Sequence, residues 1–140
     1  MAPLFPVLEP ARCTVCHACE RACVEARYGP ADDRMVLERR RLRIRVELGT
    51  PALDVCFHCE GSPCVPVCPH FALLRFRDGR VELDEARCTG CGKCIPACPY
   101  DAIRRVTELD LALKCDGCRP LGIDPACVQA CPTSALSVSK

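Results

Sequence analysis

The feature that most constrains this chain is the run from Cys88 to Pro99, which reads C-T-G-C-G-K-C-I-P-A-C-P. Its cysteines follow the spacing C-x2-C-x2-C-x3-C with a proline after the last, which is a ligand pattern for a 4Fe–4S cluster. Gly90 and Gly92 lie between the ligands, where positive φ lets the backbone pass close to the cluster. The fourth cysteine of such a run ligates a different cluster, so the run predicts a second cysteine motif.

Three further motifs contain all the remaining cysteines. The chain has 140 residues and 16 cysteines, and they fall into four groups of four. In chain order the groups are motif I (Cys13, Cys16, Cys19, Cys23), motif II (Cys56, Cys59, Cys64, Cys68), motif III (Cys88, Cys91, Cys94, Cys98) and motif IV (Cys115, Cys118, Cys127, Cys131). Motifs II, III and IV end in Cys-Pro, whereas Val24 follows motif I. In motif IV the second gap is lengthened to residues 119–126.

The number of cysteines alone also fits a secreted disulfide scaffold. The grouping disfavours that class, and residues 1–12 contain three prolines and no apolar signal-peptide core. No apolar run approaches the length of a membrane span. We therefore expect a cytoplasmic protein without direct membrane insertion, in which reduced thiols are free to bind metal.

Zinc is the main alternative metal, because motif IV alone resembles a pair of zinc knuckles. Three thiolates at the spacing of motifs I and III do not fit a zinc knuckle, so zinc throughout is disfavoured. The formal charge is +1, but sixteen thiolates and four cores of about +2 would lower it to roughly −7. The arginine-rich composition therefore does not indicate nucleic-acid binding.

Between the motifs, the pattern predicts short elements. We expect a helix over 20–26 that stops near 28–30, a strand over 41–48 ended by 49–51, a hairpin of strands 72–76 and 80–83, and strands over 102–106 and 135–138. Leu42, Ile44, Val46 and Leu48 would share one face of the 41–48 strand. The other face would carry Arg41, Arg43 and Arg45, either as a solvated face or as a docking surface for an acidic partner.

Several non-cysteine side chains lie beside the motifs. His17, His58 and His70 are interpreted as exposed residues or as second-layer neighbours of a cluster, since the cysteines already supply sixteen ligands. Glu60 and Asp116 would lower a cluster's reduction potential, and Tyr100 would pack over a cluster or in a small core. No nucleophile–base pair, phosphate-binding loop or open metal position is visible, so no catalytic residue is assigned.

The chain resembles the four-cluster ferredoxin-type electron-transfer subunits of molybdopterin and tungstopterin oxidoreductases, hydrogenases and carbon monoxide dehydrogenases. The resemblance rests on C-F-H-C at 56–59, P-C-V-P-V-C-P at 63–69, D-G-R-V at 78–81, C-P-Y at 98–100, K-C-D-G-C at 114–118, P-A-C at 125–127 and C-P at 131–132. It implies an α+β fold of two ferredoxin-like two-cluster modules, with short β-hairpins and short helices around four 4Fe–4S clusters.

The resemblance also implies a division of the chain and of its ligands. Residues 1–140 would form one polyferredoxin domain, with module A from 1–55 plus 107–140 (motifs I and IV) and module B from 56–106 (motifs II and III). The implied ligand sets are cluster one (Cys13, Cys16, Cys19, Cys131), cluster two (Cys56, Cys59, Cys64, Cys98), cluster three (Cys88, Cys91, Cys94, Cys68) and cluster four (Cys115, Cys118, Cys127, Cys23).

The function that this resemblance implies is a non-catalytic electron-transfer subunit. It would relay single electrons between a large catalytic subunit and another redox carrier or a second copy of itself. The favoured partner is a tungsto- or molybdopterin oxidoreductase such as an aldehyde- or formate-oxidising enzyme. Alternatives are a free-standing polyferredoxin or a subunit of a hydrogenase or carbon monoxide dehydrogenase, whereas a regulatory sensor is disfavoured because no DNA-binding helix is visible.

Overall fold

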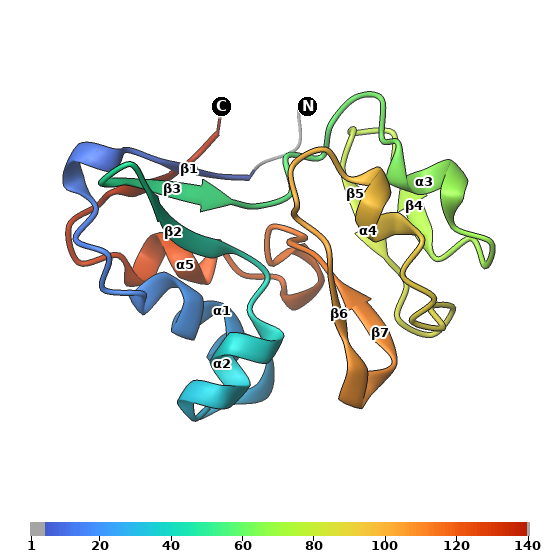
Figure 1. Cartoon of the computed structure of the whole chain (residues 1–140), viewed down its shortest axis with the longest axis horizontal. Coiled ribbons are helices and arrows are strands. Elements are labelled where there is room, and N and C mark those ends of the chain that lie inside the picture. Colours follow the sequence, from blue (N-terminus) through green and yellow to red (C-terminus); the bar gives the residue numbers. More distant parts are fainter. Residues whose placement is uncertain (1–4, 140) are drawn as a thin grey trace.

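Four two-stranded antiparallel sheets and a set of short helices make up the computed structural model, which describes residues 5–139 (Figure 1). The strands are β1 (Pro6–Leu8), β2 (Arg43–Glu47), β3 (Thr50–Asp54), β4 (Leu73–Arg75), β5 (Val81–Leu83), β6 (Arg104–Val106), β7 (Leu111–Leu113) and β8 (Leu136–Val138). The helices are α1 (Ala18–Tyr28), α2 (Asp33–Arg39), α3 (Cys64–Val67), α4 (Cys94–Ala97) and α5 (Ala126–Ala130), with 3-10 turns η1 (Pro10–Arg12), η2 (Thr107–Leu109) and η3 (Arg119–Leu121).

One half of the molecule joins the two ends of the chain. Strand β1 pairs with β8, with Val7 opposite Ser137, and β2 pairs with β3 beside them. Helices α1 and α5 pack against each other and lie below these sheets in the view of Figure 1. The buried residues of this half form one hydrophobic cluster (Cys19, Cys23, Leu42, Ile44, Val55, Cys127, Leu136).

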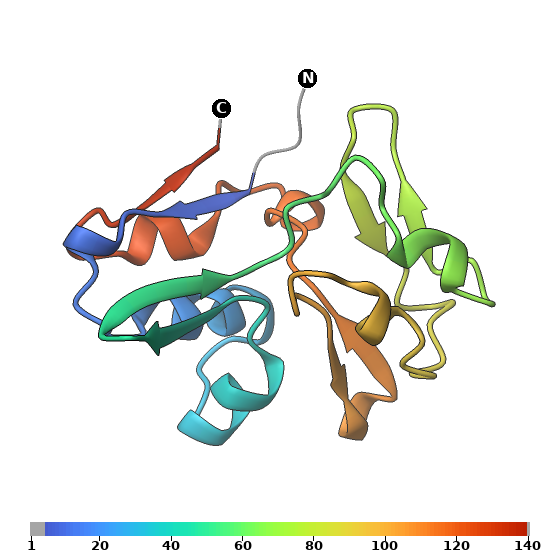
Figure 2. The same ribbon diagram turned by 45° about the horizontal axis from the view of Figure 1, so that its top comes forward.

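The middle of the chain forms the other half. It contains the β4–β5 and β6–β7 hairpins together with the short helices α3 and α4, which pack against each other (Figure 2). A second hydrophobic cluster fills it (Cys64, Leu73, Val81, Cys94, Ile103, Ala112). Cysteines belong to both hydrophobic clusters, so the ligand motifs and the apolar core occupy the same space.

The predicted hairpin of 72–76 and 80–83 is confirmed as β4–β5, and the strands over 102–106 and 135–138 as β6 and β8. The helix over 20–26 is present within the longer α1, which ends at Tyr28 before Gly29. Strands β1 and β7 were not predicted, because three-residue strands carry little periodicity. The five-residue strand β3 and helix α2 were not predicted either. Helix α2 begins at an N-cap, where Asp32 accepts a hydrogen bond from Met35 N at 2.8 Å.

The 41–48 strand differs from its prediction in two ways. Residues 50 and 51 do not end it but begin β3, so that 43–54 is a hairpin. Its apolar face is also divided: Leu42 and Ile44 are buried, but Val46 is 55% and Leu48 101% exposed, since the hairpin tip extends past the core. Arg41 is 7% exposed and is buried rather than on an outward face.

Candidate iron–sulfur sites

In the half that joins the chain ends, the helices position cysteines of motifs I and IV. Cys19 and Cys23 lie on α1 and Cys127 on α5. Nearby, a small cavity is lined by three cysteines of motif I and the last cysteine of motif IV (Cys13, Cys16, Cys19, Cys131). The same four cysteines are the ligand set that the resemblance implies for cluster one.

The remaining cysteines of this half also lie near one another. Burial raises the pKa of the Cys127 thiol far above its ordinary value, and the charges of Cys115, Cys23 and Cys118 raise it further. A charge effect of this kind requires proximity. Those four side chains correspond to the set implied for cluster four, and Cys23, Cys118 and Cys127 are buried.

In the other half, a second small cavity is lined by Cys88, Cys91 and Cys94 of motif III and by Cys68 of motif II. This is the set implied for cluster three. Burial raises the pKa of Cys64, and the charges of Cys56 and Cys59 add to the increase, so these three motif II cysteines lie together. Cys98, the fourth residue implied for cluster two, packs in the same hydrophobic cluster as Cys64.

The backbone is arranged to bind anionic sulfur. Seven cysteine sulfurs accept a backbone N–H at 3.2–3.5 Å, from donors that include the alanines opening the segments after motifs II, III and IV (Ala72, Ala102, Ala135). At Cys131, burial raises the thiol pKa, but hydrogen bonds from Thr133, Leu136 and Ala135 outweigh it and lower the pKa to about 7. Such donors stabilise thiolate, the form that ligates iron.

A positive φ repeats at equivalent positions of the motifs. The second residue after the first cysteine is in the left-handed region in all four motifs (Val15, His58, Gly90, Gly117). The third residue after the last cysteine is also there in motifs II, III and IV (Phe71, Asp101, Ser134). This conformation is unfavourable for a β-branched residue such as Val15. The shared backbone therefore follows from the loop that wraps the ligand, not from local residue preference.

Burial of other thiols has the opposite effect to the N–H donors. It raises the pKa of Cys19 to about 12, with the charge of Glu20 adding to it, and that of Cys94 to about 11. Metal binding releases the protons of such thiols, because thiolate is the form that ligates the metal. Among residues 5–139, no group of three or more His, Cys, Asp or Glu side chains is placed so that it could hold a single metal ion.

The three histidines occupy different environments. His58 is 4% exposed, and its Nδ1 accepts a hydrogen bond from Val81 N at 3.0 Å. Burial, and then the charge of Lys114, lower its pKa to about 4. His17 is exposed and contacts the buried Glu20, whereas His70 is exposed. His58 is thus a neutral neighbour of the motif II cysteines at pH 7.

The other residues flagged beside the motifs are placed as follows. Glu60 is exposed, whereas Asp116 is buried. Tyr100 is 45% exposed, and its ring meets Phe57 edge-on with centroids 4.8 Å apart. Tyr100 therefore joins the loops of motifs II and III through an aromatic contact.

A buried ion network between the two halves was not predicted. Asp116, next to Cys115, contacts Arg27 of α1 and lies 3.5 Å from Arg41 Nη1. Arg41 also donates to the Lys114 carbonyl and to Glu85 Oε1, both at 3.0 Å. Strand alternation had placed Arg41 outward with Arg43 and Arg45, and only the packing of the halves reveals its partners.

Sequence comparison now adds to this geometry. A family model described as a 4Fe-4S dicluster domain matches residues 50–140. The chain belongs to this family. The prediction of a 4Fe–4S ferredoxin-type chain is therefore confirmed, and 4Fe–4S clusters are its cofactors.

Individual relatives extend the similarity beyond the family match. UacF of Escherichia coli (strain K12) is 40% identical over 138 residues, which cover 94% of this chain but only 20% of UacF. The thiosulfate reductase electron transfer subunit PhsB of Salmonella typhi is 36% identical, with 92% of this chain and 71% of PhsB covered. Formate hydrogenlyase subunit 2 of E. coli (strain K12) is 34% identical, with 94% and 79% covered.

The relatives in this family thus align with motif I as well, which precedes the matched dicluster region. Within residues 5–139, no helix is both long and apolar enough to span a membrane.

Proposed function

We propose that the chain is a non-catalytic subunit that relays single electrons along four 4Fe–4S clusters. The observation that supports this most directly is the pair of cavities, each lined by three cysteines of one motif and the last cysteine of another. That exchange of the fourth ligand is typical of two-cluster ferredoxins. The proposed ligands are the four sets named above, with Cys98 and Cys23 completing clusters two and four.

The clusters would supply one-electron redox chemistry, and the protein would hold them and set their potentials. Each proposed set has four thiolates, so no coordination position is left open for a substrate. Backbone N–H groups on seven sulfurs stabilise negative charge at the ligands. Hydrogen bonds of this kind tune reduction potentials in iron–sulfur proteins.

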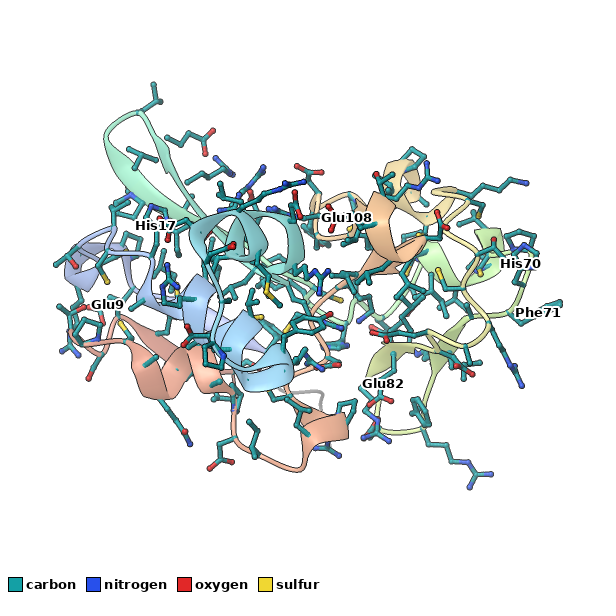
Figure 3. The ribbon with its side chains drawn as sticks, turned by 90° about the horizontal axis from the view of Figure 1, so that it is seen from below. Glu9, His17, His70, Phe71, Glu82 and Glu108 are labelled. Carbon is teal, nitrogen blue, oxygen red and sulfur yellow. The ribbon has the colours of Figure 1, made fainter. Side chains whose placement is uncertain are left out.

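The proposed modules, 1–55 plus 107–140 and 56–106, are supported by the two separate hydrophobic clusters. Ala112 of the β6–β7 hairpin packs in the second hydrophobic cluster, which is the core of module B. The segment up to Leu113 is therefore better grouped with module B. His17, beside Cys16, and His70, near Cys68, lie at opposite ends of the molecule (Figure 3). This arrangement favours a line with clusters one and three at its ends.

The proposed partner at one end of the line of clusters is a large catalytic oxidoreductase subunit. A second electron carrier or another copy of this chain would bind at the opposite end. Two relatives are named as subunits, one of thiosulfate reductase and one of formate hydrogenlyase. A tungsto- or molybdopterin enzyme in the cytoplasm is our favoured host. A hydrogenase, a carbon monoxide dehydrogenase or a free-standing polyferredoxin are the alternatives.

Metal analysis tests the number of clusters. We expect sixteen iron and sixteen acid-labile sulfide per chain after anaerobic isolation, because sixteen cysteines supply four complete ligand sets. About eight iron, or stoichiometric zinc, would contradict the four-cluster proposal.

The exchange of ligands between motifs has its own test. Cys98→Ala should disturb cluster two, whereas the matched variant Cys94→Ala, four residues earlier, should disturb cluster three. Mössbauer and EPR spectra of the two variants are expected to lose different cluster signals. Loss of the same signal in both variants would refute the exchange.

Native size-exclusion chromatography separates the subunit from the free carrier. A subunit elutes with a catalytic partner from its own source cells, and the partner is then identified by mass spectrometry. Elution of all the holoprotein near 15 kDa would favour the free-standing polyferredoxin.

A further inference from the structure

Lys114 is the largest fully buried side chain among the described residues, at 1% exposure. It precedes Cys115 and lies where the two halves of the molecule meet. Lysine is rarely buried completely unless a partner compensates its charge. The groups around Lys114 therefore indicate which anion compensates its positive charge.

The protein itself offers Lys114 no carboxylate. Its Nζ donates to the carbonyl of Val81 on β5 at 2.5 Å and to the carbonyl of Cys115 at 2.8 Å, and within residues 5–139 it forms no ion pair. An ammonium group has three N–H donors, so one is left without a protein acceptor in this part of the chain. A buried cation held only by neutral carbonyls is strongly unfavourable unless another anion lies near.

The neighbouring arginines provide a contrast. Arg41 pairs with Asp116 and Glu85, and Arg27 pairs with Asp116. The carboxylates of this interface are thus already engaged by other cations. Lys114, in the same interface, is the cation that they leave uncompensated.

The positive charge of Lys114 reaches cysteines on both sides of the interface. Lys114 directly precedes Cys115 of motif IV, and its Nζ donates to the Cys115 carbonyl. On the other side, Val81, whose carbonyl also accepts from Nζ, packs in the same hydrophobic cluster as Cys64 of motif II. Cys64 and Cys115 belong to the ligand sets proposed for clusters two and four. A +2 core with four thiolates carries a net charge of about −2, and reduction adds one more negative charge.

We propose that Lys114 is a shared positioning and redox-tuning residue, whose buried ammonium offsets the negative charge of the two inner clusters, two and four, at once. This rests on the proposed ligand sets. Because a cation stabilises the reduced cluster more than the oxidised one, Lys114 raises both inner potentials together. Electrons then meet similar potentials on either side of the boundary between the modules.

The test compares Lys114→Met, which removes the charge, with Lys114→Arg, which keeps it. Lys93→Met is the control, since Lys93 precedes Cys94 in the same way but is exposed. Each holoprotein is first analysed for iron and then titrated anaerobically with EPR detection. We expect two of the four midpoint potentials to fall in Lys114→Met, by the same amount at low and high salt because a buried charge is poorly screened.

In Lys114→Arg all four potentials should stay at their original values, and in Lys93→Met at most one should move, by an amount that salt reduces. Unchanged potentials in Lys114→Met, a change in only one, or equal changes in Lys114→Met and Lys114→Arg would overturn the proposal. If Lys114→Met does not retain iron, recovery in Lys114→Arg supports a charge requirement, and loss in both assigns Lys114 to packing. Failure of the four-cluster function appears separately, as fewer than sixteen iron in the unchanged protein.

Discussion

Individual residues hold the cluster loops through backbone geometry more than through their side chains. Gly90, between the first two cysteines of motif III, has φ of +73°. A Cβ at this position would lie 2.6 Å from the backbone oxygen of Asp110, which no real contact allows. Gly90 is therefore required both for its conformation and for the close approach of the β6–β7 hairpin, whose Ala112 N–H donates to Cys88 Sγ at 3.4 Å.

This predicts a severe effect of Gly90→Ala. Gly49→Ala is the matched control, because Gly49 has a similar φ of +78° but nothing within 4 Å of the added Cβ. The control should cost about 1–2 kcal/mol from conformation alone. Gly90→Ala should cost roughly 1–3 kcal/mol more from the clash, and should lower the iron content, as measured by denaturation and metal analysis. Equal stability of the two variants would contradict the close approach.

At the scale of elements, the β2–β3 hairpin carries an ion cluster of its own. Arg43 donates to Asp54 Oδ2 at 2.5 Å, and Arg45 Nε lies 3.0 Å from Asp54 Oδ1. Burial raises the pKa of Asp54, but the hydrogen bonds from both arginines outweigh it and lower the pKa. Because these charges are already paired, the solvated-face interpretation is favoured over a docking surface at Arg43 and Arg45.

The arginines of this segment should therefore respond differently to substitution. Arg41→Gln removes a 7% exposed cation and leaves Glu85 and part of Asp116 unpaired, so it should cost about 3 kcal/mol and weaken the junction of the halves. Arg45→Gln should cost only about 1 kcal/mol, because Arg45 reaches solvent and Arg43 still pairs with the buried Asp54. Iron content and urea midpoints measure the difference. Equal destabilisation would show that Arg41 is not a specific link.

Over the whole molecule, the clusters must replace much of an ordinary core. The chain has four Phe, two Tyr and no Trp, and the buried residues of its two hydrophobic clusters are aliphatic residues and cysteines. Each proposed ligand set also joins segments far apart in sequence, as Cys13 and Cys131 are. Cluster ligation would thus cross-link the fold in places where apolar burial is small.

Removal of the clusters should therefore unfold the chain. Anaerobic chelation of iron is expected to abolish far-UV circular dichroism and protection from hydrogen exchange together, because metal binding and folding share one free energy. Reconstitution with iron and sulfide should restore both. Retention of native exchange protection in the iron-free chain would show that the apolar contacts suffice.

The sequence by itself determined the cofactor, the four motifs and the first strand after each of motifs II, III and IV. Thiolate spacing within a motif is local, so the printed order of Cys88, Cys91 and Cys94 already specifies three ligands of one cluster. The β4–β5 hairpin was likewise predictable, since Asp78-Gly79 joins two strands that pair only with each other. In both cases neighbours in sequence are neighbours in space.

The tertiary structure alone decided the relations between distant segments. It brought Cys131 to the cavity of motif I, paired β1 with β8, and buried Arg41 and Lys114 between the halves. Residue pattern predicts which side of a strand an arginine occupies, but not whether another module covers that side. Burial and charge compensation depend on which surfaces meet, so the sites of Arg41 and Lys114 required the packed molecule.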